Sequence, residues 1–193
     1  MNVKSVLLIV LLSIFPLPAQ VENPDYTLTA EVGVGYSRFM NDLDYDKLNK
    51  NGFSGNVRFM WNPEHLLSIG IETGYQYLYS IRINNLDTEF GSTKFSASMI
   101  AVPIYIVNSM KITDRLKIFG GSGIFLLYNS GELFGDNLNS SQISIGFHAG
   151  VHYTEPISNN VSIGGQFKYS YISKIQDHAL SFQFLLIYDL LRW

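Results

Sequence analysis

The stretch from Leu67 to Ile81, "LSIGIETGYQYLYSI", alternates between apolar side chains and small or polar ones over its whole length. Successive side chains of a β-strand point to opposite sides, so this pattern predicts a strand with one apolar and one polar face. Seven further runs share this period of two, and no run of helical period competes with them. They cover residues 26–39, 52–62, 94–107, 116–128, 142–154, 161–174 and 179–193.

The lengths of these runs favour a membrane protein. They average about a dozen residues, whereas strands of globular proteins have ~5–6 residues and tilted membrane-crossing strands need ~9–11. The connections alternate as well. Long polar segments at 40–51, 82–93 and 129–141 are separated by shorter ones at 62–66, 108–115 and 155–160, and only the short connection at 174–178 breaks the trend.

Alternating long and short connections are typical of outer-membrane barrels, which have long outer loops and short periplasmic turns. The sequence therefore predicts an all-β fold, an eight-stranded antiparallel up-and-down transmembrane β-barrel. An even number of strands places the N- and C-termini on the same side of the membrane. Because the first connection is long, we expect both termini in the periplasm.

The polar faces predict a lumen that is filled with side chains. Five charged residues lie in mid-strand among glycines and serines: Glu31, Arg58, Glu72, Lys117 and Lys168. An unpaired buried ion costs several kcal/mol, so we expect these charges to form a network. Arg58 and Glu72 fall opposite each other if their hairpin is centred near His65, and we expect them to pair. Eight strands leave an interior just wide enough for side chains, so no open pore is expected.

Aromatic residues on the apolar faces lie near the strand ends, as the girdles of membrane barrels do. The predicted girdle residues are Trp61, Tyr77, Tyr79, Tyr153, Tyr169, Tyr171 and Trp193. In the last strand, Phe182, Phe184, Leu186, Tyr188 and Leu190 are expected to face lipid, and a bulge is needed if Leu191 and Trp193 face it too. Pro103 lacks an N–H group, so we expect a bulge or a strand end near it.

The N-terminal sequence "MNVKSVLLIVLLSIFPLPAQ" has the pattern of a signal peptide. Lys4 supplies the positive start and Val6 to Phe15 the apolar run, which is too short for the ~20 residues of a spanning helix. Ala19 is the expected last residue before cleavage. We therefore predict a signal peptide at 1–19, followed by a barrel domain at 20–193 of an exported protein.

Composition narrows the function classes. The net charge of −3 gives no basic footprint for nucleic acid. The chain has no cysteine, which excludes disulfides, thiol catalysis, cysteine metal sites and a lipoprotein anchor. Charged residues make up 15% of the chain, against about 25% in ordinary soluble proteins.

The segment "MWNPEHLLSIGIETGY", the segment "VPIYIV" and the terminal Trp193 resemble a family of small outer-membrane β-barrels of Bacteroidetes-type bacteria, the PorT-like domain. The resemblance covers roughly the whole mature chain, and its more general relatives are the OmpA- and OmpX-like barrels. It implies an eight-stranded barrel in the outer membrane of a Gram-negative cell but no agreed activity. Members of these families assist secretion or serve as anchors, adhesins or envelope stabilisers.

The residues favour a structural, anchoring or partner-binding protein that is not an enzyme, with no catalytic residues, cofactor or metal. One alternative is a lipid A-modifying enzyme, since Ser144, His148 and His152 share one face of a strand. Residues four apart on a strand are ~13 Å apart, too far for a catalytic pair or a shared metal. A second alternative is a secreted lipocalin-like carrier, which would place its apolar face inside.

The expected partners follow from this interpretation. Outer-membrane lipids surround the barrel, and the barrel-insertion machinery reads the C-terminal strand ending in Trp193, as the resemblance implies. An envelope protein partner of unknown identity is also considered. No contact with nucleic acid is expected.

Overall fold

The computed structural model of the chain describes residues 26–41, 47–63, 67–88 and 91–193. The predicted signal peptide and His65 lie outside these residues. The described part contains nine strands: β1 (Thr27–Met40), β2 (Leu48–Asn49), β3 (Asn51–Asn62), β4 (Leu67–Thr88), β5 (Gly91–Lys111), β6 (Leu116–Leu133), β7 (Asp136–Pro156), β8 (Val161–Ile172) and β9 (Asp177–Arg192). It holds no helix with the length and apolar character needed to cross a membrane.

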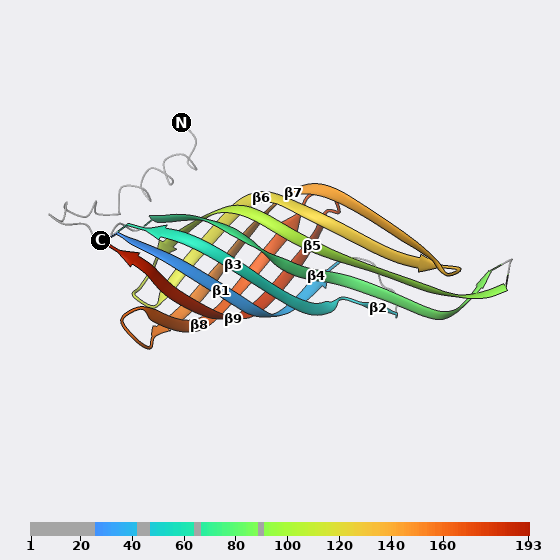
Figure 1. Ribbon diagram of the computed structural model, residues 1–193, viewed down its shortest axis with the longest axis horizontal. Helices are drawn as coiled ribbons and strands as arrows, with labels where there is room; N and C mark the ends of the chain where they lie inside the picture. The colour runs from blue at the N-terminus through green and yellow to red at the C-terminus, as the bar shows by residue number, and fades with distance from the viewer. Residues whose placement is uncertain (1–25, 42–46, 64–66, 89–90) are drawn as a thin grey trace, which may run out of the picture.

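All strands except β2 form a closed antiparallel ring, which confirms the predicted eight-stranded up-and-down barrel (Figure 1). The ring closes where β9 pairs with β1, from Thr27 opposite Arg192 to Met40 opposite His178. Just beyond this ladder the backbones of Tyr26 and Trp193 exchange hydrogen bonds of 2.9 and 3.0 Å. Closure satisfies the backbone groups of the first and last strands, which hydrocarbon would otherwise leave without partners.

The apolar faces of the strands form the outer surface of the ring. Ile69 and Ile71 are 45% and 61% exposed, whereas Arg58 and Glu72 on the opposite faces are 0% and 1% exposed. A lipocalin-like carrier requires the reverse arrangement, so this alternative is wrong. The outer surface instead matches the lipid-facing band of a membrane barrel.

The last strand follows the predicted parity. Phe182 and Phe184 are 64% and 54% exposed, and Gln183 between them is buried. A register shift between β1 and β9 follows Leu28, which pairs with Leu191 while Thr29 pairs with Asp189. This bulge lets both Leu190 and Leu191 lie exposed at the end of the strand.

The expected bulge or strand end at Pro103 is not found. Pro103 pairs with Phe125 of β6 in regular register. On the β4 side, Thr73 pairs with Ile104 and Gln76 with Ala101, so the register continues and only the two intervening pairs are missing. The Thr73 hydroxyl donates a hydrogen bond of 2.9 Å to the Pro103 carbonyl. The barrel therefore absorbs the missing N–H by a local gap in the ladder, and the nearest bulge in β4 lies at Leu78.

The prediction that segments 82–93 and 129–141 are loops is wrong, because most of their residues extend the β4–β5 and β6–β7 hairpins. β4 and β5 have 22 and 21 residues and pair out to Thr88 opposite Gly91. β6 and β7 pair out to Leu133 opposite Asp136. In the register, β3 accompanies β4 only as far as Gln76 and β8 accompanies β7 only as far as Gly146. Four strands therefore project beyond one side of the barrel, with β2 alongside β4, as Figure 1 shows.

Candidate functional site

The centre of the interior is an ionic cluster around Arg58. Strand register places Arg58 of β3 directly between Glu31 of β1 and Glu72 of β4. Its Nη1 donates to Glu31 at 2.7 Å, and its Nε and Nη2 donate to one Glu72 oxygen at 2.8 and 2.6 Å. The guanidinium carbon also lies 4.4 Å from the ring centroid of Phe119, a cation–π contact from the opposite wall.

Lys168 of β8 completes the cluster, because its Nζ donates to the second Glu72 oxygen at 2.8 Å. Two cations and two carboxylates then compensate each other: Arg58 and Lys168 against Glu31 and Glu72. All four side chains are at most 6% exposed. A buried ion is tolerated when it is paired and hydrogen-bonded, and this cluster meets both conditions.

Amide side chains connect the ionic cluster to the neighbouring wall. Gln166 accepts a hydrogen bond from Arg58 at 3.3 Å and donates to Asn56 at 2.7 Å and to Gln183. Gln183 in turn donates to Ser54 at 2.9 Å. The network therefore crosses the lumen between the β1–β3–β4 wall and the β8–β9 wall, and it ties distant strands together.

Side chains fill the interior at this level. Gly33 shows how tightly: a Cβ added there would lie 2.5 Å from the Asn56 side-chain oxygen and 2.7 Å from the Gln166 nitrogen. Toward the projecting strands the lumen becomes apolar, with Phe39, Leu78 and Leu127 at most 1% exposed in one packed cluster. The barrel interior thus combines the charged cluster around Arg58 with buried apolar side chains.

Lys117, the fifth predicted member, is not part of the cluster. It is half-buried at the start of β6, opposite His152, and forms no ion pair within 4.0 Å in the described part of the chain. Sequence reasoning placed it on the correct face but could not fix its height along the barrel. The position depends on the stagger of all eight strands.

The interior histidines do not form a catalytic site with Ser144. His148 Nδ1 lies 3.5 Å from Glu72, and the His148 ring packs against Tyr105 with centroids 4.3 Å apart. His152 packs against Phe119 at 5.7 Å. The Ser144 hydroxyl instead accepts from the Lys174 N–H and donates to the Ile145 carbonyl, at 2.9 and 3.0 Å. Among the described residues, no group of three His, Asp or Glu side chains could hold a metal ion.

The predicted girdle residues separate into two ends and one interior position. Tyr26, which sequence reasoning missed, stacks on Trp61 with centroids 5.9 Å apart and on Trp193 at 6.1 Å. Its role emerges only when β9 closes on β1, a pairing that the alternation alone does not position. Tyr153 is 49% exposed, and its hydroxyl contacts Glu155 near the same end.

At the other end, Tyr169 and Tyr171 are half-buried and lie beside Phe147, with centroid distances of 6.5 and 5.2 Å. Tyr77 is half-buried too and lines a groove on the outer face. Tyr79 is the exception, because it stacks on the interior Phe39 at 5.8 Å. The bulge at Leu78 reverses the parity of β4, so Tyr79 turns inward and does not belong to an outer girdle.

The projecting strands carry a second candidate site, an open sheet edge. The Ser173 N–H donates to the Ile145 carbonyl at 3.0 Å, so the backbone groups of odd-numbered β7 residues point to the β8 side. Beyond that bond β8 no longer accompanies β7. The N–H and C=O groups of Asn137, Asn139, Ser141 and Ile143 therefore point sideways from the sheet, and none of the described strands pairs with them.

Comparisons with known proteins agree with this geometry. A family model for an outer membrane protein beta-barrel domain matches residues 7–186. No curated protein sequence matches the chain significantly. One similar structure is the attachment invasion locus protein Ail of Yersinia pestis, solved in complex with the heparin analogue sucrose octasulfate. Its sequence is 14% identical to this chain and its TM-score is 0.55, and the match covers 87% of this chain and 99% of Ail. A major outer membrane protein from Thermus thermophilus is 15% identical with a TM-score of 0.57, covering 86% of this chain and 99% of that protein. At these identities the similarity shows the fold alone.

Proposed function

Because the chain belongs to the outer membrane protein beta-barrel domain family, we propose that it anchors a projecting β-sheet outside the cell and offers the open edge of β7 to a partner. The membrane part is the ring, whose apolar surface faces lipid and whose lumen is filled. In this proposal the protein is neither a pore nor an enzyme. The feature that carries the proposal is the unpaired stretch of β7 above the level of β8.

The orientation is part of the proposal. Short turns at 112–115 and 157–160 join β5 to β6 and β7 to β8. Such short turns are typical of the periplasmic side of a membrane barrel. Tyr26, the first described residue, and the C-terminal Trp193 lie at this same end, where their backbones are hydrogen-bonded to each other. We therefore place both termini in the periplasm and the projecting strands outside. The signal peptide at 1–19 would direct export, and the last strand ending in Trp193 would be read by the insertion machinery.

An open edge binds an extended peptide by strand addition, in which backbone hydrogen bonds supply the affinity. Edges that must avoid such pairing usually carry lysine, proline or an inward charge. The stretch from Asn137 to Ile143 has none of these, because it reads "NLNSSQI". This composition supports a partner that adds a strand. A PorT-like role in secretion is one setting for such a partner and stays a proposal that rests on resemblance.

The test replaces outward N–H groups without disturbing the β6 ladder. In the double variant Asn139→Pro/Ser141→Pro, each proline removes an N–H that faces the open side. The control Asn139→Ala/Ser141→Ala changes the side chains and keeps the backbone. A photo-crosslinking residue at Ser140, installed in each variant, reports the partner in intact envelopes.

We expect a discrete crosslinked protein with the unaltered edge and with the alanine control, and at least a tenfold loss with the proline variant, since two backbone bonds of ~1 kcal/mol each disappear. Heat-modifiable gel migration verifies that every variant contains a folded barrel. Equal crosslinking with both double variants, or none with the unaltered edge, would contradict strand addition.

A further inference from the structure

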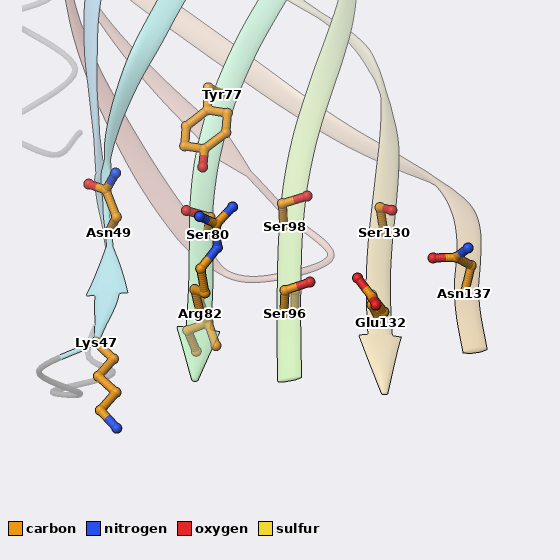
Figure 2. Close-up of a pocket in the computed structure, with 13 residues that line it drawn as sticks. Lys47, Asn49, Tyr77, Ser80, Arg82, Ser96, Ser98, Ser130, Glu132 and Asn137 are labelled. Atoms are coloured by element: carbon orange, nitrogen blue, oxygen red, sulfur yellow. The ribbon is translucent and has the colours of Figure 1, made fainter. Parts of the chain in front are cut away.

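The outer face of the projecting sheet carries a polar groove directly above the lipid-facing surface. The groove has a volume of about 560 Å³ and is lined by β2 and the four projecting strands. An adjoining hollow of about 400 Å³ shares Ser98 and Ser130 with it. Figure 2 shows the labelled side chains on one side of the sheet, from Asn49 on β2 to Asn137 on β7.

The strand register arranges this groove in rows. The lowest row is lipid-like, with Tyr77 opposite Ile100 and Ile100 opposite Tyr128. The next row contains only small polar side chains, Asn49, Ser80, Ser98, Ser130 and Asn139, each opposite its neighbour across four strand pairs. The third row has Arg82, Ser96, Glu132 and Asn137 in the same relation. A continuous ladder of hydroxyl and amide groups therefore begins where the apolar surface ends.

The height of the ladder matches the headgroup layer. Two residues along a strand rise ~6.6 Å, which becomes roughly 5 Å along the membrane normal at a tilt of about 40°. The second row therefore stands about 5 Å above the last apolar row, within a headgroup region that is about 5–8 Å thick on each side of the hydrocarbon, and the third row stands about 10 Å above it, just beyond that region. The short serine side chains leave the hollow open at this height.

The charges at the rim favour an anionic occupant. Lys47 and Arg82 line the groove, and Lys94 lines a second hollow that shares Arg82 and Glu132 with it. The lining of the two hollows therefore carries three cations and one carboxylate, that of Glu132. All four side chains are exposed. Within the described ranges none of them forms an ion pair within 4.0 Å, unlike Arg115 and Lys111 at the opposite end of the barrel. These cations are thus available to a ligand.

We infer that this groove binds the phosphorylated sugar headgroup of the outer-leaflet glycolipid, lipopolysaccharide, in which the acyl chains lie along the apolar row below. Serine and asparagine groups donate to and accept from sugar hydroxyls, and Arg82 and Lys94 contact phosphate. The inference rests on the orientation in the proposed function. The continuity of lipid-facing and polar rows on one face favours a lipid headgroup over a soluble glycan.

The test uses the full chain, folded in detergent micelles, and measures binding of lipid A bearing its two phosphates and inner-core sugars by native mass spectrometry. The variant Arg82→Ala/Lys94→Ala removes two of the three groove cations and leaves Lys47. The control Lys111→Ala/Arg115→Ala removes the same charge at the other end. A third variant, Ser98→Leu/Ser130→Leu, keeps all charges and fills the groove.

The expected dissociation constant rises at least about 10-fold for the groove cation variant and for the serine variant, and stays within about 2-fold for the control. Phosphatidylglycerol, which is anionic but has no sugar, should bind at least about 10-fold more weakly than the glycolipid. Equal binding of the two charge variants, unchanged binding of the serine variant, or equal binding of phosphatidylglycerol would overturn the inference. Full displacement by millimolar inorganic phosphate would indicate a free phosphate site and overturn it as well.

Micelles have no inner and outer leaflet, so this measurement does not depend on how the protein sits in the membrane. Loss of glycolipid binding therefore rejects the groove assignment alone. The orientation is tested separately by labelling of intact cells.

Discussion

At the scale of single residues, Arg58 holds the interior together. It contacts both interior carboxylates, and replacing it with an apolar side chain leaves Glu31 without a cation and Glu72 with Lys168 only. We predict that Arg58→Met lowers the free energy of unfolding in micelles by about 3–5 kcal/mol, the cost of breaking a buried ion pair. Urea titration followed by gel migration measures this change.

Two comparisons make the Arg58 experiment specific. The exposed pair of Arg115 and Glu155, 3.0 Å apart, offers a matched control, and Arg115→Met should cause little measurable loss because solvent screens surface pairs. The double variant Arg58→Met/Glu31→Gln should be less destabilised than the sum of its single variants, because each removes the partner of the other. An additive result would show that the two groups do not interact in the folded barrel.

A contact between two residues could be predicted from sequence when both residues lie in one hairpin. Arg58 and Glu72 lie on neighbouring strands that few residues of sequence separate, so their spacing along the sequence was enough to predict the pairing. Contacts across the lumen, such as Lys168 to Glu72, depend on the stagger of the closed ring and could only be described as a network. The assignment of Tyr79 to the girdle was wrong because the bulge at Leu78 reverses the direction of every side chain that follows it in β4.

At the scale of elements, the crossing strands were predictable and their outward extensions were not. Inside the membrane, lipid and lumen demand opposite side chains and create a clear period of two. Beyond the lipid-facing rows, polar residues occur on both faces of β4 to β7, and such a composition is typical of a loop. The sheet continues there because neighbouring strands still pair, which a single-strand pattern does not reveal.

The tip of the β6–β7 hairpin offers a test of this extension. Phe134 and Gly135 both have positive φ, 54° and 85°, as a two-residue turn of a hairpin requires. We predict that Gly135→Val destabilises the outer hairpin by about 1–3 kcal/mol, since a β-branched residue is strained there, and leaves the barrel folded. Cleavage at Glu132 by a glutamate-specific protease should become faster, measured by mass spectrometry of the fragments.

Gly131 supplies the control for that experiment. It lies four residues earlier in β6, and an added Cβ would come no closer than 3.6 Å to any neighbour. Gly131→Ala should therefore leave the cleavage rate unchanged. If Gly135→Val also left it unchanged, the turn would not limit the opening of the hairpin.

At the scale of the whole molecule, the ring and its lipid-facing surface establish a membrane barrel, and sidedness is the property to measure. The chain contains no cysteine, so single cysteines can be placed without a background. We predict that Asp136→Cys, at the tip of the projecting sheet, reacts with a membrane-impermeant maleimide on intact cells. Ser158→Cys, in the turn between β7 and β8, should react only after the outer membrane is permeabilised. The opposite pattern would invert the proposed orientation.

The whole-molecule architecture was the most accessible level from sequence. Eight long alternating runs, few charges and small inward residues are consistent with one closed cylinder, since hydrocarbon allows no open edge. The uneven height of the barrel wall could not be predicted from the sequence, because it results from four strands that extend beyond their neighbours β3 and β8.

This uneven wall gives the protein a front and a back within the plane of the membrane. On the low side, β1 ends at Met40 opposite His178 near the start of β9. On the high side, β4 to β7 form a projecting wall that extends beyond β3 and β8. Any molecule that binds the projecting wall must approach it from one direction within the membrane plane. Two copies bound to one partner would therefore have a fixed rotation relative to each other about the membrane normal.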